Sequence, residues 1–141
     1  MLRYLLMCAL VGACVSNESV PQKQLSSVFQ IADDANDVPA TVSGRIKLYS
    51  NVWEVRMSET DSHDCLALAF PSKHLPDSFP GEFMGEISGT LRKHELRYLL
   101  DATFYEVHGN RISNSTCLNH SKFYLLVDNF ILPNTPLISV E

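Results

Sequence analysis

The chain has 141 residues, of which 45% are hydrophobic and 19% charged, and its formal net charge at pH 7 is −5. This composition is typical of a globular protein and excludes collagen-like, coiled-coil and wholly disordered chains. The length fits one domain. Because the acidic balance gives the whole molecule no attraction for nucleic acid, we do not expect nucleic acid among its partners.

The first thirteen residues have the pattern of a secretory signal peptide. Arg3 precedes an apolar run from Tyr4 to Ala13, and polar residues begin soon after Cys14. As a helix this run would rise only about 15 Å, half the thickness of a hydrocarbon core of roughly 30 Å. The run is therefore too short to span a membrane, and we expect residues 1–13 to be a signal peptide.

Val11-Gly12-Ala13-Cys14 resembles the lipobox of bacterial lipoproteins, in which an aliphatic residue and two small residues precede a cysteine. The resemblance covers only the first fourteen residues. It implies that Cys14 is acylated and anchors the protein in the cell envelope. It also implies an outer-membrane location facing the periplasm, since Val15 stands where lipoproteins retained in the inner membrane have Asp. Val11 and Ala13 also suit the general signal peptidase, so a soluble secreted or periplasmic protein is the alternative.

Four cysteines are present, and two of them are accounted for by the N-terminal segment. Cys8 leaves with the signal peptide, and Cys14 is used by the lipid. The remaining two, Cys65 and Cys117, suit one disulfide in an oxidising compartment, worth about 4 kcal/mol through the loop it closes. A redox or metal-binding pair is the alternative, although neither cysteine belongs to a C-x-x-C motif.

Residues 14–41 are predicted to form the lipidated N-terminus and a tether, followed by a β domain over residues 42–141. The tether segment is rich in Ser, Asn, Gln and Asp, which is the composition of a flexible spacer. Four apolar residues within it have helical spacing and allow one short helix: Leu25, Val28, Phe29 and Ala32.

From residue 42 onward, apolar and polar residues alternate, which is the pattern of half-buried β-strands. The expected strands run over residues 42–49, 53–57, 66–70, 83–91, 98–107 and 123–132. Five or six short strands without a long helix predict an all-β domain, and closure into a small barrel would leave no exposed strand edges. Gly44 and Gly89 fall within strands, where a strongly coiled strand must bend.

The order of these elements is a long bent strand, a hairpin, a third strand, a loop and two further strands. This order resembles the OB-fold, and Gly44-x-Ile46-x-Leu48 and Ile87-Ser88-Gly89-Thr90-Leu91 resemble its first and fourth strands. The resemblance implies a five- to six-stranded barrel with a binding face. A β-sandwich is the alternative.

The sequence contains none of the common catalytic motifs, such as G-x-S-x-G, H-E-x-x-H or a Gly-rich phosphate loop. We therefore expect no enzymatic activity, no cofactor and no metal. The alternative is a metal-dependent or hydrolytic enzyme that uses the loop around His63, where Asp61 and Asp64 flank the imidazole. Such a metal site would need a ligand from elsewhere, and His120 would supply one if the disulfide drew the two loops together.

Basic and aromatic residues gather on strands that would be neighbours in such a barrel. OB-folds hold oligonucleotides and oligosaccharides with residues of this kind. We expect a non-catalytic binding or structural module for an envelope protein or an anionic glycan. A solvated face paired with Glu54 and Glu86 is the alternative. The candidate binding face comprises Arg45, Lys47, Tyr49, Arg56 and Arg92, with Lys93 and Arg97 nearby.

Overall fold

A computed structural model describes residues 21–130 of the chain. The predicted signal peptide and Cys14 lie outside the described residues, as does the end of the last predicted strand. The elements in chain order are β2 (Lys23–Leu25), η2 (Val28–Gln30), β3 (Val38–Leu48), β4 (Trp53–Arg56), β5 (Cys65–Pro71), β6 (Gly81–Lys93), β7 (Phe104–Val107), β8 (Asn110–Ser113), η3 (Thr116–Asn119) and β9 (Phe123–Phe130).

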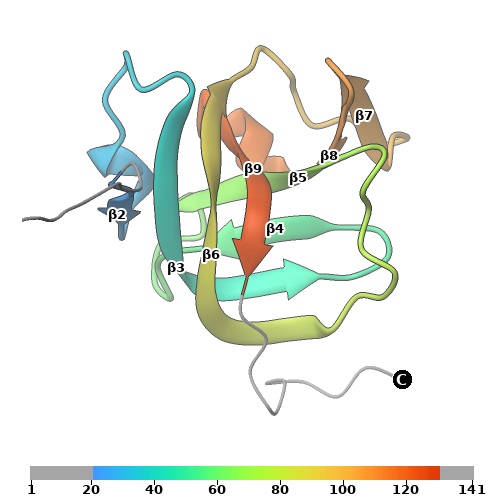
Figure 1. The fold of residues 1–141 in the computed structure, drawn as a ribbon, viewed down its shortest axis with the longest axis horizontal. Coiled ribbons are helices and arrows are strands. Elements are labelled where there is room, and N and C mark those ends of the chain that lie inside the picture. Colours follow the sequence, from blue (N-terminus) through green and yellow to red (C-terminus); the bar gives the residue numbers. More distant parts are fainter. Residues whose placement is uncertain (1–20, 131–141) are drawn as a thin grey trace, which may run out of the picture.

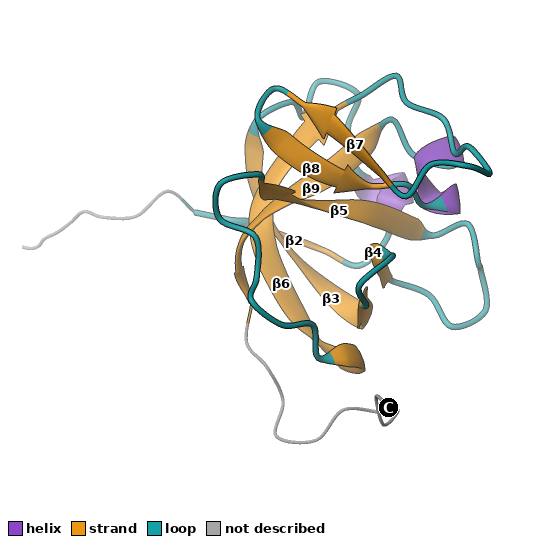
Figure 2. Cartoon of the chain, turned by 90° about the vertical axis from the view of Figure 1, so that its right-hand side faces the viewer, coloured by secondary structure: helices purple, strands orange, loops and turns teal. Residues whose placement is uncertain are grey.

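Five of the strands close into a barrel (Figures 1 and 2). Strand β3 pairs with both β4 and β6, β4 continues to β5, and β9 joins β5 to β6. The β5–β9 pair is parallel, and the other four pairs are antiparallel. This closed order confirms the all-β, OB-like barrel and excludes the sandwich, because the two edges that a sheet would leave open are paired with each other.

Gly44 and Gly89 lie where the backbones of adjacent strands approach too closely for a side chain. A Cβ atom at Gly44 would lie 2.2 Å from the Arg56 carbonyl oxygen, and one at Gly89 would lie 2.0 Å from the Leu126 carbonyl oxygen. Contacts this short are prohibitive, so the two positions require glycine. At Gly89 the pairing of β6 with β9 also shifts register, which bends the strand as the sequence pattern indicates.

The core fills the barrel with side chains from alternating strand positions. Trp53 is only 1% exposed and lies in this core. Its ring lies 4.5 Å from that of Phe104, 5.0 Å from Phe70 and 5.7 Å from Phe79, measured between ring centroids. Phe79 comes from the Pro-rich connection between β5 and β6, so this connection packs against the core.

Residues 23–31, expected within the tether, pack on the barrel. Strand β2 pairs in parallel with β3, and Leu25 and Val28 are buried. The expected short helix is a single 3-10 turn, η2, and Phe29, which is 76% exposed, and Ala32, which is also exposed, do not pack with Leu25 and Val28. The Asp64 carboxylate determines this geometry, because it accepts the Val28 N–H at 2.6 Å. Strand β3 then begins at Val38, earlier than the predicted domain boundary at residue 42.

The connection between β6 and β9 also differs from the prediction. The strand expected over residues 98–107 starts at Phe104, and part of the expected polar loop forms β8, which pairs with both β7 and β5. The β7–β8 turn places His108 and Gly109 at φ 51° and 80°, the left-handed backbone of a tight hairpin. Asn114 holds residues 99–103 away from the sheet by accepting the Leu99 N–H and donating to the Leu99 carbonyl.

Candidate functional site

Cys65 and Cys117 form the predicted disulfide, with sulfur atoms 2.02 Å apart. It joins the start of β5 to η3, and both cysteines are fully buried. The side chain of Ser115 caps η3 by accepting the Cys117 N–H at 3.1 Å. The disulfide therefore holds the long β6–β9 connection against the barrel wall and brings the loops on either side of it together.

The two histidines that the sequence singled out lie in contact. The ring centroids of His63 and His120 are 4.0 Å apart, with the ring planes inclined by 29°. Asp61 accepts the backbone N–H of His63 at 2.9 Å. Asp64 faces elsewhere, because its buried carboxylate accepts hydrogen bonds from Ser27 and Val28. Within residues 21–130, no group of three or more His, Cys, Asp or Glu side chains is arranged to hold a metal ion.

Arg45 and Tyr49 of the candidate binding face share one carboxylate. Arg45 contacts Glu82 at 2.8 Å and Glu59 at 3.1 Å, and the Tyr49 hydroxyl donates to Glu82 at 3.4 Å. The hydrogen bond to Glu82 raises the pKa of Arg45 above its usual value. Desolvation, with the nearby Glu82 charge, raises the pKa of Tyr49. This part of the face is charge-compensated.

Lys47 and Arg56 share Glu54, whose carboxylate is buried. Arg56 lies 2.8 Å from it and Lys47 3.9 Å, and Ser115 donates to it at 2.6 Å. Both cations line a cleft of about 380 Å³ that Tyr98 also borders. This cleft lies between the β3–β4 turn and the β6–β9 connection, the region that OB-folds use for ligands. Here too, a carboxylate offsets the positive charge.

The fifth predicted residue, Arg92, is separated from the other four. Arg92 follows Leu91, which pairs with Val38, the first residue of β3. Tyr49 follows the last residue of β3, so Arg92 and Tyr49 lie near opposite ends of that strand. The Arg92 guanidinium lies 2.8 Å from Asp37. The structure therefore brings Arg45, Lys47, Tyr49 and Arg56 together and leaves Arg92 on another part of the surface.

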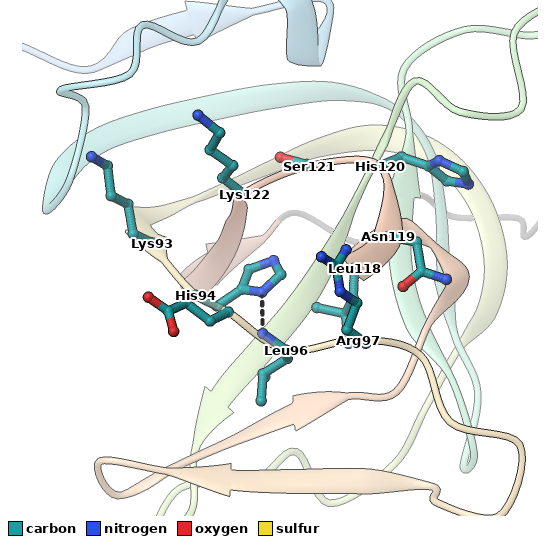
Figure 3. A pocket seen from close by; sticks show the side chains of 10 residues that line it. Lys93, His94, Leu96, Arg97, Leu118, Asn119, His120, Ser121 and Lys122 are labelled. Atoms are coloured by element: carbon teal, nitrogen blue, oxygen red, sulfur yellow. Dashed lines mark hydrogen bonds between the residues drawn. The ribbon is translucent and has the colours of Figure 1, made fainter.

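A larger hollow lies beside Arg92, and we call it the cationic pocket (Figure 3). It has a volume of about 710 Å³ and is formed by two segments, the end of β6 with the residues after it and the stretch from η3 to β9. These segments are neighbours because Lys93 pairs with Phe123. The lining residues are Lys93, His94, Glu95, Leu96, Arg97, Leu118, Asn119, His120, Ser121 and Lys122.

Two of the three cations of this pocket have no carboxylate partner among the described residues, and the third has an exposed one. In the described part of the chain, the side chains of Lys93 and Arg97 form no ion pair, and Lys122 lies 3.5 Å from Asp33, with both side chains largely exposed. Figure 3 shows the side chains of Lys93 and Lys122 extending in the same direction, and the Arg97 guanidinium on the other side of the His94 ring in this view. Glu95 is the single acidic residue among the described residues of the lining, and together these residues carry net positive charge.

Hydrogen bonds fix the backbone on both sides of the cationic pocket. His94 donates its N–H to the Lys122 carbonyl at 2.9 Å, and its Nδ1 accepts the Leu96 N–H at 3.0 Å, the dashed line in Figure 3. Asn119 accepts the Tyr98 N–H at 3.1 Å. Burial lowers the pKa of His94, which keeps Nδ1 free to accept this bond at neutral pH. The pocket is therefore pre-formed.

From the sequence, Lys93 and Arg97 were predicted to lie near the strand face, and neither Lys122 nor His94 was predicted to take part in binding. No local signal could have joined these residues, because their proximity depends on the pairing of β6 with β9.

Among the described residues, no helix has the length and hydrophobicity needed to cross a membrane. Comparison with models of known families found no match, and searches against curated proteins and solved structures found no similarity either.

Proposed function

We propose that this protein is a lipid-anchored module of the cell envelope that binds an anionic glycan in the cationic pocket without catalysing a reaction. The observation that carries the proposal is the set of three cations, Lys93, Arg97 and Lys122, around a hollow of about 710 Å³. Pockets for small ligands typically occupy about 300–1,000 Å³, so the hollow has room for one or two sugar units.

The charge distribution supports this pocket over the strand face. The protein has 16 acidic and 11 basic side chains, so a carboxylate partner is available for most cations. Arg45, Lys47 and Arg56 each have one. Lys93 and Arg97 have none within residues 21–130. An anion entering the cationic pocket would therefore meet two unpaired cations, Lys93 and Arg97, and would compete only with the exposed Lys122–Asp33 pair, which is weak because it is solvated.

The lining chemistry favours a phosphorylated sugar. Arg97 can form paired hydrogen bonds to phosphate or carboxylate oxygens, and lysines bind phosphate as point charges. Asn119 and Ser121 offer amide and hydroxyl groups to sugar hydroxyls. Lipopolysaccharide carries such sugars and crosses the periplasm on its way to the outer leaflet, so a protein anchored at Cys14 and facing the periplasm would meet them there. The Cys65–Cys117 disulfide also fits an oxidising compartment.

A binding titration tests the proposal. The full chain would be titrated calorimetrically with deacylated, phosphorylated lipopolysaccharide core oligosaccharide. We expect the double variant Lys93→Ala/Lys122→Ala to bind at least about tenfold more weakly, because it loses two direct contacts to anionic groups. The matched control is Lys23→Ala/Lys73→Ala, which changes the net charge equally at two exposed positions away from the pocket.

The control separates site binding from general electrostatics. Equal weakening in the two double variants would contradict a specific pocket, and so would an absence of binding by the unsubstituted chain. A third variant, Arg45→Ala/Lys47→Ala, tests the strand face and is expected to bind like the control. If this third variant lost more affinity for the oligosaccharide than Lys93→Ala/Lys122→Ala, the binding site would lie on the β3–β4 face instead.

A further inference from the structure

His63 and His120 form a cluster that the proposed glycan binding does not explain. Their rings stack at a centroid distance of 4.0 Å although they lie on different loops. His63 precedes β5, and His120 follows η3. Both side chains are exposed, so ring nitrogens of both are reachable from solvent. Two solvent-accessible imidazoles at this separation can both reach one small ion.

The backbone beneath both rings is fixed. The disulfide at Cys65 and Cys117 lies two residues after His63 and three residues before His120. Asp61 accepts the His63 N–H at 2.9 Å, and the His120 N–H donates to the Cys117 carbonyl at 3.0 Å. The proximity of the two imidazoles is therefore imposed by the fold, and a ligand would not have to order two mobile loops.

The electrostatic surroundings suit a divalent cation. A metal ligand must be a neutral imidazole. The Asp61 carboxylate, which accepts the His63 backbone N–H, places negative charge beside the pair. Arg56 is the nearby cation, but its guanidinium already forms an ion pair with Glu54 at 2.8 Å and donates a hydrogen bond to the Ser62 carbonyl at 2.7 Å.

We propose that His63 and His120 together bind a divalent transition-metal ion such as Zn²⁺ or Ni²⁺ through one imidazole nitrogen from each ring. Imidazole is a preferred ligand of these ions, whereas Mg²⁺ and Ca²⁺ favour oxygen. The rings leave the stacked arrangement by rotation about their side-chain bonds, which their exposure permits. Water completes the coordination sphere, so the site is an open one, unlike the four-ligand sites that stabilise folds.

Titration with Ni²⁺ tests the site. The full chain carrying Cys8→Ser and Cys14→Ser would be used, so that no thiol competes and the disulfide stays intact. We expect calorimetry to show that His63→Gln and His120→Gln each bind Ni²⁺ at least about tenfold more weakly than this parent, since each removes one direct ligand. His74→Gln is the matched control, because His74 is exposed in the loop between β5 and β6.

Proton NMR provides a second readout. Substoichiometric Ni²⁺, which is paramagnetic, is expected to broaden the imidazole signals of His63 and His120 before those of His74. Unchanged affinity in His63→Gln and His120→Gln would overturn the site, as would equal weakening in His74→Gln. The test is independent of the glycan proposal, because His63 does not line the cationic pocket and His63→Gln should leave oligosaccharide binding unchanged.

Discussion

Breaking the Cys65–Cys117 disulfide is expected to destabilise the domain strongly. The two cysteines are separated by 52 positions in the sequence, so the bridge removes a large part of the conformational freedom of the unfolded chain. In the chain-entropy model, a loop of this length contributes about 4 kcal/mol. That amount is a large fraction of the roughly 5–15 kcal/mol by which typical domains are stable.

Thermal unfolding followed by circular dichroism, with and without a phosphine reductant, measures this contribution. Each kcal/mol shifts the melting temperature of a small domain by roughly 4 °C, so reduction should lower it by more than about 10 °C. The variant Cys65→Ala/Cys117→Ala should melt near the reduced protein. Cys14→Ser is the control. It should have the melting temperature of the unsubstituted chain, and reduction should lower that temperature by the same amount in both proteins. An unchanged melting temperature after complete reduction would refute the structural role of the bridge.

Three further changes have defined outcomes. Gly89→Ala should lower the free energy of unfolding by at least about 1–3 kcal/mol in urea denaturation, because its Cβ would lie 2.0 Å from the Leu126 carbonyl oxygen; an unaltered midpoint would disprove that close approach. Burial holds the pKa of His94 in the folded protein below the ordinary 6.5, so the unfolded chain binds this proton more tightly. The free energy of unfolding should therefore fall as the pH drops below about 6.5. His94→Gln should show a shallower decrease, and an equal decrease would exclude His94 as its source. Protein extracted from its native membrane should have the mass of a triacylated chain beginning at Cys14, and Cys14→Ser should lose that increment; an unlipidated native chain would contradict the anchor.

The barrel could be predicted from sequence because its strands carry their own signal. The alternation in Val42–Leu48 and Phe83–Leu91 identifies two strands whose inward residues are buried, and these strands form the longest ladder of the sheet. The disulfide followed from elimination among four cysteines. Gly44 and Gly89 marked the places where the backbone of a neighbouring strand comes too close for a side chain.

The parts that sequence reasoning missed depend on contacts between distant residues. Val28 is buried in a 3-10 turn because Asp64, far along the chain, accepts its N–H. Residues 98–102 form no strand, and the side chains of Asn119 and Asn114 bind the backbone of Tyr98 and Leu99. Helical and strand periodicities describe only neighbouring residues, so neither arrangement was detectable.

The candidate site illustrates the same limit. The sequence indicated Glu54 as a partner of the basic face, and Glu54 does pair with Lys47 and with Arg56, its neighbour two positions along β4. Glu82 was not indicated, because it reaches Arg45 only through the pairing of β3 with β6. The free cations proved to be Lys93 and Arg97, which a different strand pair brings next to Lys122.

Chemical-shift mapping tests glycan binding in the cationic pocket most directly. The isotope-labelled full chain would be titrated with the phosphorylated core oligosaccharide, and backbone amide shifts recorded by NMR. Binding in the cationic pocket predicts the largest shifts at residues 93–97 and 118–122. Shifts confined to residues 45–49 and 53–56 would place the ligand on the strand face instead. The absence of any shift at saturating oligosaccharide would contradict glycan binding altogether.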